Sequence, residues 1–238
     1  MGNCMSRPRL WGEGATTIGL RQLMRHVKPG DIILFDGEGI DAYCIQFMSA
    51  NDGTSHAGIV LRADPSDPKS RLLVGEAYLS VIGPDYYRGK SRHSGFQVVD
   101  LETRLATYRG HVSWRPINPT REHPNFVALQ ESYKKFLGNL PQPIAYVHFD
   151  LEGIKRFIEI GLASVDDHDN RNMEVCNTMV AHSLYALGVI KAEDLYRLDN
   201  ITLACFGSTY GQLPFRPGWQ MGELHKLVRE DRFDEAWE

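Results

Sequence analysis

Residues 55–61 read Ser-His-Ala-Gly-Ile-Val-Leu, an apolar run of strand length that opens on an imidazole. Four further strand-like runs lie at residues 31–35, 72–78, 96–101 and 111–117. Loops rich in Pro and Asp, such as residues 63–70, separate these runs, which are therefore predicted to be strands. Their succession along the first half of the chain favours a meandering antiparallel sheet.

Helical spacing of apolar residues predicts the other elements. The predicted helices cover residues 17–27, 41–48, 126–137, 151–162 and 174–187. The last of them ends at Gly188, a residue type that commonly closes a helix in the left-handed conformation. Strands in the first half and helices in the second predict an α+β fold.

The composition narrows the classes of function. A chain of 238 residues, 42% of them hydrophobic, can bury one substantial core, so one compact domain is expected. The formal net charge of −4 argues against a nucleic-acid binder, which usually carries a clustered excess of Lys and Arg. The cysteines, Cys4, Cys44, Cys176 and Cys205, lie far apart without metal-ligand spacing. We therefore expect no disulfide framework, no metal, no cofactor and a reducing intracellular setting.

The first six residues, Met-Gly-Asn-Cys-Met-Ser, fit the pattern for N-myristoylation. Gly2 would carry the myristoyl group and Cys4 could carry a palmitoyl group. One acyl chain holds a protein to a membrane only marginally, but this segment offers a second acylation site and a basic excess. Residues 1–28 are thus predicted to be a lipid-anchor tail and docking helix on a cytoplasmic protein at a membrane surface. The alternative is a short disordered N-terminus in a bacterial chain, which would not be acylated.

Cys176 is the candidate nucleophile. Asn172 can cap the helix predicted at residues 174–187, which leaves Cys176 near its first turn. Backbone N–H groups and the helix dipole favour a thiolate there and could also hold an oxyanion. The alternative is a small buried side chain that only packs, the commoner fate of a cysteine without a disulfide.

His56 and Glu76 are the candidate partners of this thiol. Gly58 leaves room beside His56 for another backbone or a substrate, although many histidines at strand ends are purely structural. Glu76 lies within the apolar run 72–78, where a buried carboxylate needs a partner. If the two strands are neighbours, Glu76 would orient the imidazole as the third member of a triad. The alternative for Glu76 is a charge that faces solvent.

Four segments together resemble a known family. They are Pro-Gly-Asp-Ile-Ile-Leu at 29–34, residues 55–61, Val-Gly-Glu-Ala at 74–77 and Glu-Val-Cys-Asn-Thr-Met-Val at 174–180. In this order they resemble the permuted NlpC/P60 papain-like proteins of the YiiX and YaeF type and their poxvirus relatives, in which the histidine precedes the cysteine. The same order occurs in relatives of lecithin:retinol acyltransferase. The resemblance covers about residues 29–190 and leaves 191–238 as an extension expected to pack on the core.

The resemblance implies an antiparallel sheet or partial barrel packed against the helix that carries the cysteine. It also implies that Cys176 is the nucleophile, His56 the base and Glu76 the polar third residue, while Tyr146 lines the substrate cleft. Many relatives have a serine after the cysteine, whereas this chain has Asn177.

We therefore expect a thiol-dependent hydrolase or acyltransferase that acts on an amide or ester, in a lipid acyl group or a peptide. The competing class is a membrane-tethered binding module of the same fold without catalysis. A papain-like order of Cys44 before His111 is formally open, but Cys44 lies inside its predicted helix, away from the N-terminal end. The acidic loop at residues 166–169 lacks calcium-loop spacing and is expected to be solvated.

Overall fold

The computed structural model describes residues 16–37, 54–64, 66–78, 83–86, 95–118, 176–191, 206 and 213–229. The elements before the centre of the chain are β1 (Thr16–Gly19), α1 (Leu20–His26), β2 (Ile32–Gly37), β3 (His56–Arg62), β4 (Leu72–Tyr78), β5 (Gly95–Asp100), α3 (Leu101–Thr107), β6 (Gly110–Arg115) and β7 (Ile117–Asn118). Those after it are α6 (Cys176–Ala186), β8 (Gln220–Met221) and β9 (His225–Val228).

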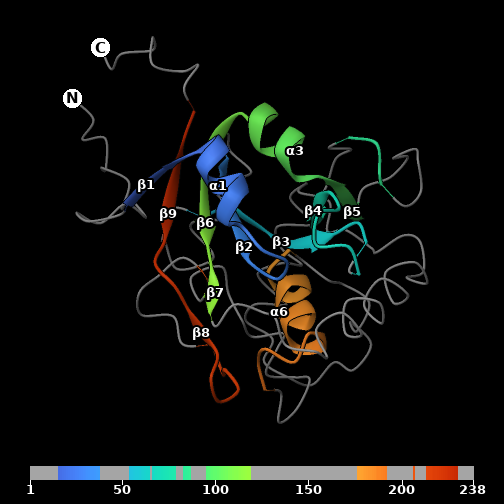
Figure 1. The fold of residues 1–238 in the computed structure, drawn as a ribbon, viewed down its shortest axis with the longest axis vertical. Coiled ribbons are helices and arrows are strands. Elements are labelled where there is room, and N and C mark those ends of the chain that lie inside the picture. The colour runs from blue at the N-terminus through green and yellow to red at the C-terminus, as the bar shows by residue number, and fades with distance from the viewer. Residues whose placement is uncertain are drawn as a thin grey trace, which may run out of the picture.

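Within these residues the strands form a seven-stranded sheet with the order β1-β9-β6-β2-β3-β4-β5 (Figure 1). Neighbouring strands are antiparallel, apart from β1 and β9, which are parallel. The short strands β7 and β8 pair separately. The structure is thus a mixed α and β protein with a mostly antiparallel sheet, in agreement with the predicted α+β class.

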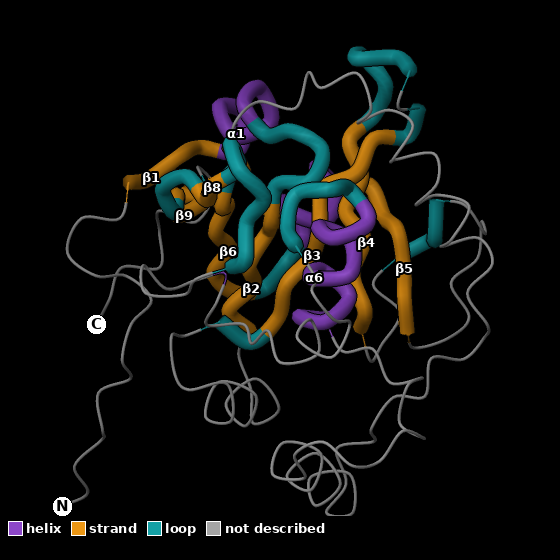
Figure 2. The backbone as a smooth tube through the Cα atoms, turned by 90° about the horizontal axis from the view of Figure 1, so that it is seen from below, coloured by secondary structure: helices purple, strands orange, loops and turns teal. Residues whose placement is uncertain are grey.

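Helices lie on both faces of the sheet because successive residues of its strands point to opposite sides. On one face α6 packs against β3 and β4 (Figure 2). Ile32 and Leu34 of β2 belong to this α6-side core. On the other face α1 and α3 cover a second core, to which Ile33 and Phe35 of the same strand contribute. We refer to these as the α6-side core and the α3-side core.

The structure corrects two predicted boundaries near the first helix and the fifth strand. Residues 17–19 were expected to be helical but belong to β1, where β-branched side chains pair with the distant β9. The run 96–101 ends one residue early because Asp100 caps the new helix α3, its side chain accepting from the backbone N–H of Thr103 at 2.8 Å. Helix α3 itself was not predicted.

The strand predicted at 111–117 is divided. Strand β6 ends at Arg115, and β7 begins after Pro116, a residue that has no N–H group to donate to a sheet. The predictions for β2, β3 and β4 are confirmed within two residues. The helices expected at 41–48, 126–137 and 151–162 lie outside the described residues.

The helix predicted at 174–187 is confirmed over the described part, as α6. Its end at Gly188 is also confirmed, since this glycine has a φ of 71°. The N–H of Gly188 donates to the carbonyl of Tyr185 at 2.9 Å, and that of Val189 donates to Leu184 at 2.8 Å. These bonds satisfy carbonyls that the helix end would otherwise leave without donors.

Segments from all three predicted parts of the chain enter one sheet. Strand β9, from residues 191–238, pairs with β6 of the central part. Strand β1, from residues 1–28, pairs in turn with β9. Leu23 of α1 is fully buried in the α3-side core. No helix among the described residues combines the length and the apolar character needed to cross a membrane.

Candidate active site

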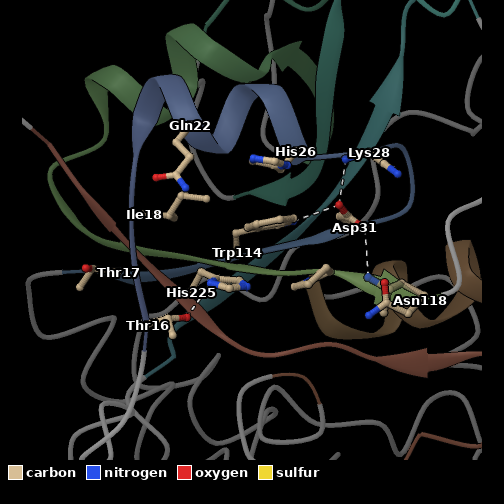
Figure 3. Close-up of a pocket in the computed structure, with 12 residues that line it drawn as sticks. Thr16, Thr17, Ile18, Gln22, His26, Lys28, Asp31, Trp114, Asn118 and His225 are labelled. Atoms are coloured by element: carbon tan, nitrogen blue, oxygen red, sulfur yellow. Dashed lines mark hydrogen bonds between the residues drawn. The ribbon is translucent and has the colours of Figure 1, made fainter.

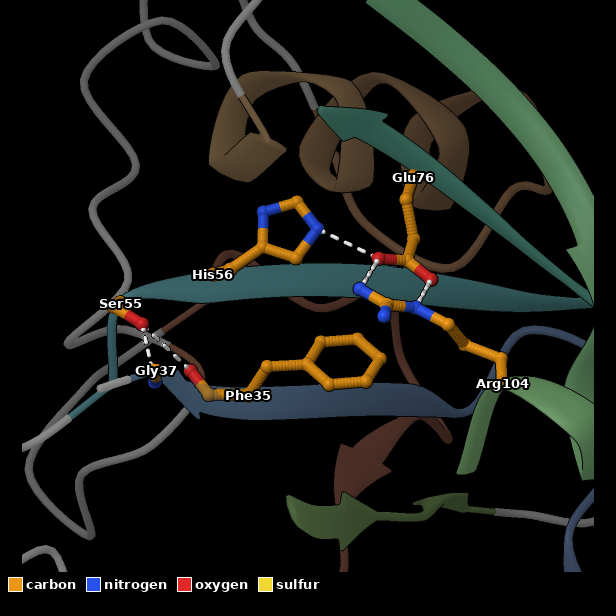
Figure 4. Close-up of polar contacts among 6 residues, drawn as sticks. All are labelled: Phe35, Gly37, Ser55, His56, Glu76 and Arg104. Atoms are coloured by element: carbon orange, nitrogen blue, oxygen red, sulfur yellow. Dashed lines mark hydrogen bonds and ion pairs between the residues drawn. The ribbon is translucent and has the colours of Figure 1, made fainter. Parts of the chain in front are cut away.

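The β3–β4 register brings His56 and Glu76 together. Gly58 lies opposite Glu76 in this antiparallel pair, and His56 is two residues before Gly58 on the same strand face. The imidazole Nε2 lies 2.9 Å from Oε2 of Glu76 (Figure 4). Glu76 is completely buried, so the alternative of a charge facing solvent is wrong.

The pairing depends on the missing side chain at Gly58. A Cβ atom there would lie 2.8 Å from Cγ2 of Val74, 2.9 Å from Cγ of Glu76 and 3.1 Å from the carbonyl oxygen of Gly75. Such approaches are shorter than van der Waals contact between carbon atoms. Glycine is therefore required for the Glu76 side chain to cross β3 and reach His56.

Arg104 of α3 is the third member of the buried network. Its Nε donates to Oε1 of Glu76 at 2.8 Å and its Nη2 donates to Oε2 at 2.9 Å (Figure 4). Its guanidinium carbon lies 4.8 Å from the ring centroids of both Phe35 and Tyr108. The fork geometry and the two aromatic faces hold the guanidinium in one orientation.

Arg104 was not among the site residues predicted from the sequence. The available signal was its place in a helical apolar stripe with Leu101, Leu105 and Tyr108, three to four residues apart, all of which are buried. A cation in such a stripe implies a buried anionic partner, because a buried charge is seldom without one. Residue type alone did not say which carboxylate that partner was.

The network keeps Glu76 ionised. Burial by itself raises the pKa of this carboxyl, but the hydrogen bonds from His56 and Arg104 and the attraction of their charges outweigh it. The net result is a pKa below the ordinary value of 4.5. Glu76 therefore offers the imidazole a negatively charged acceptor at neutral pH.

Cys176 interacts with the same imidazole. Burial lowers the pKa of His56, but the charge of Cys176, a hydrogen bond with it and the contacts with Glu76 raise that pKa from 6.5 to about 9. Since Nε2 is directed at Glu76, Nδ1 is the nitrogen that the ring presents elsewhere, as Figure 4 shows. The arrangement allows Nδ1 to exchange a proton with the thiol while Nε2 is held by the carboxylate.

His56 occupies the point where the two cores meet. Cys176 is the first residue that the structure describes in α6 and belongs to the α6-side core. Phe35, whose ring centroid lies 5.5 Å from that of His56, belongs to the α3-side core. As the first residue of β3, His56 can contact side chains from both layers.

Ser55 fixes the backbone that precedes the imidazole. Its N–H donates to the carbonyl of Phe35 at 3.0 Å, and its hydroxyl donates to the same oxygen at 3.2 Å. The hydroxyl also accepts from the N–H of Gly37 at 2.8 Å (Figure 4). These bonds tie the start of β3 to β2 and restrict the position of His56.

Most of the other residues singled out from the sequence cannot be placed relative to this network. Tyr146, Gly2, Cys4 and Cys44 lie outside the described residues. His111 is exposed on β6, where it pairs in register with Asp36. No group of three side chains suited to a metal ion occurs among the residues that the structure describes.

A separate cavity of about 490 Å³ lies between α1, β6 and β9 (Figure 3). Its lining shares no residue with the His56 network and includes the stacked rings of Trp114 and His225, whose centroids are 4.9 Å apart. The Asp31 carboxylate at its edge accepts from the N–H groups of Lys28 and Ile117 and from Nε1 of Trp114, at 2.8 to 3.0 Å. Asp31 thereby joins the turn before β2 to Trp114 and Ile117, which indicates a structural role.

Comparison with known proteins adds no assignment, since no family model matches the sequence and no curated protein matches it significantly.

Proposed function

We propose that this protein is a thiol-dependent hydrolase or acyltransferase that uses Cys176, His56 and Glu76. The observation that carries the proposal is the position of one imidazole between a buried carboxylate and a thiol on a helix. A cysteine, a base that contacts it and a group that orients the base are the parts that nucleophilic acyl transfer needs.

The reaction would begin from the pair in which the proton of the Cys176 thiol lies on Nδ1 of His56, since a His56 pKa of about 9 favours this state at neutral pH. The thiolate then attacks the carbonyl carbon of an ester or amide, and the imidazolium returns the proton to the departing alcohol or amine. The resulting thioester is broken by water or another acceptor, from which His56 removes a proton before returning it to the sulfur. Thiol and imidazole leave the cycle unchanged, and the acyl group is transferred to the acceptor.

We further propose that the fold is permuted papain-like and that the chain is a member of the permuted NlpC/P60 group. Support comes from the order of histidine, carboxylate and cysteine along the sequence and from a helix, α6, packed on antiparallel strands β3 and β4. On this basis a lipid acyl group or a peptide-linked amide is the favoured substrate class.

The direct test is site-specific alkylation of the full-length chain with iodoacetamide, followed by peptide mass spectrometry. Cys176 should react faster at neutral pH than Cys4, Cys44 and Cys205, because only a thiolate is strongly nucleophilic. His56→Gln should slow Cys176 by about tenfold or more, the factor that one pKa unit represents. The matched control is His111→Gln, which removes an exposed imidazole from β6.

Equal reactivity of all four cysteines, unaffected by His56→Gln, would favour the alternative of a binding module without catalysis. A screen of lipid esters, N-acyl amines and short peptides should then identify a substrate. Turnover that survives Cys176→Ala would refute the assignment of the nucleophile. Loss of a general base typically lowers turnover by about 10²- to 10⁴-fold, which sets the size expected for His56→Gln.

Membrane association through Gly2 and Cys4 is a second part of the proposal. Expression in a cell that contains an N-myristoyltransferase, with a labelled myristate analogue, should label the wild type and not Gly2→Ala. Cys4→Ser should keep the label but weaken membrane association, because one acyl chain holds a protein only marginally. An unlabelled wild type would exclude this anchor.

A further inference from the structure

The Glu76 carboxylate is shared between two cationic partners with different tasks. One oxygen, Oε2, contacts both Nε2 of His56 at 2.9 Å and Nη2 of Arg104 at 2.9 Å. The other oxygen, Oε1, accepts from Nε of Arg104 at 2.8 Å. Both partners stabilise the ionised carboxylate. The bidentate contact belongs to Arg104, whose guanidinium is always charged, whereas His56 is a counter-charge only while it is protonated.

This ion pair is enclosed. Glu76 has no exposed surface, the side chain of Arg104 is 8% exposed, and the rings of Phe35 and Tyr108 cover the guanidinium. A carboxylate in such surroundings would take up a proton if the guanidinium were absent, because burial favours its neutral form. When His56 is neutral, the charge state of Glu76 therefore depends on Arg104.

The charge state of Glu76 in turn decides which nitrogen of a neutral His56 carries the proton. An ionised carboxylate can only accept, so Nε2 must donate, and Nδ1 is left without a proton. A protonated carboxyl can donate to Nε2, which then carries no hydrogen, so the ring proton moves to Nδ1. An Nδ1 that already holds a proton cannot accept another from the thiol.

We infer that Arg104 is a positioning residue for the proposed thiol chemistry: by keeping Glu76 ionised, it fixes the His56 tautomer whose Nδ1 can accept the proton of Cys176. The inference rests on the proposed function. The guanidinium donates two hydrogen bonds to Glu76, and its proposed action on His56 passes through that carboxylate. No proton is transferred to or from the guanidinium in the cycle.

The test compares Arg104→Met with wild type in the full-length chain. Alkylation of Cys176 by iodoacetamide at pH 7 should be about tenfold slower in the variant, the factor that one pKa unit represents. Arg115→Met is the matched control, because Arg115 is also buried but lies on β6 outside the network. The control should alkylate at the wild-type rate.

Arg104→Lys separates the charge from the fork geometry. A lysine keeps a positive charge near Glu76 but cannot donate two parallel hydrogen bonds, so the rate should lie between those of wild type and Arg104→Met. If Arg104→Met does not fold, as judged by circular dichroism, the lysine variant carries the test. A lysine variant with the wild-type rate at every pH would overturn the inference.

A double variant distinguishes action through Glu76 from general loss of packing. Glu76→Gln offers Nε2 a neutral oxygen that needs no counter-charge, so adding Arg104→Met to it should slow alkylation no further. Independent, multiplicative losses would contradict the inference. The ¹⁵N shifts of the His56 ring give a second readout above about pH 9, where the wild-type ring is neutral: Nε2–H in wild type and Nδ1–H in Arg104→Met.

The ring measurement also separates failure of this inference from failure of the proposed function. A Cys176 that reacts as slowly as an ordinary thiol in wild type would refute the function, whatever Arg104 does. A reactive Cys176 together with an unchanged tautomer and rate in Arg104→Met would refute the role of Arg104 alone.

Discussion

Substitution of Gly58 by alanine should destabilise the fold and impair the candidate site at the same time. The added Cβ would meet Cγ2 of Val74 at 2.8 Å and Cγ of Glu76 at 2.9 Å. Movement of the Glu76 side chain to relieve this overlap is opposed, because its carboxylate is held by His56 and by both donors of Arg104. A shift of the backbone to relieve the contact would disturb the β3–β4 pairing at the Gly58–Glu76 pair.

Overpacking a well-packed core by one carbon typically costs about 1 to 3 kcal/mol. Because Val74 and Glu76 are both completely buried, we expect Gly58→Ala to lie in the upper half of this range, at about 2 to 3 kcal/mol. The measurement is the free energy of unfolding in urea. If the slope of the unfolding free energy against urea concentration is the same as in wild type, the substitution has altered the native state rather than the unfolded chain.

The control is Gly83→Ala, where the nearest atom to an added Cβ is Cγ1 of Val99 at 3.7 Å, an ordinary contact. This variant should unfold within about 0.5 kcal/mol of wild type, the usual effect of a substitution that disturbs nothing. Gly58→Ala should also slow alkylation of Cys176, since a displaced Glu76 no longer orients His56. A Gly58→Ala protein as stable and as reactive as wild type would refute the packing argument.

Three further outcomes are expected. The pKa of His56 rises from 6.5 unfolded to about 9 folded, so the imidazolium stabilises the fold below pH 6.5 and this contribution is lost as the pH rises through about 9. One pKa unit corresponds to about 1.4 kcal/mol, so the difference in unfolding free energy between wild type and His56→Gln should fall by roughly 3 kcal/mol between pH 6.5 and about 9. Urea titrations at several pH values measure this difference, and a value that does not change with pH would contradict the prediction. Asp31→Ala should cost about 2 to 4 kcal/mol by chemical unfolding, because the N–H groups of Lys28, Ile117 and the Trp114 ring lose their acceptor; a loss under about 1 kcal/mol would argue against this. Asp100→Ala removes the cap of α3 and should lower stability by about 1 kcal/mol, whereas Asp100→Asn, which keeps an acceptor oxygen, should be nearly neutral.

Several local features could be read from residue order because they depend on neighbours in the chain. The aliphatic runs of β2, β3 and β4 and the end of α6 at Gly188 belong to this kind. The partnership of His56 with Glu76 could also be anticipated, since a carboxylate inside an apolar strand needs a nearby donor. In each case the residue types within a short segment are enough to indicate the structure or the need for a partner.

Other features came from contacts between segments far apart in the sequence. Residues 17–19 have the apolar spacing of a helix but form β1, since the parallel pairing with β9 supplies hydrogen bonds that periodicity does not reveal. Helix α3 was missed because its short apolar stripe contains a cation, which masks the pattern until the buried partner is known. Tyr146, Gly2 and Cys4 stay predictions.

Residue order alone was enough to predict the strands at the centre of the sheet, the glycine beside the imidazole and the succession of histidine, carboxylate and cysteine. The fold was needed to reveal that Arg104, 28 residues from Glu76, neutralises that carboxylate while its guanidinium packs against the rings of Phe35 and Tyr108. The reason is that a buried charge is costly unless an opposite charge lies beside it. The packing of α3 on the sheet determines that Arg104 is the residue that lies beside Glu76.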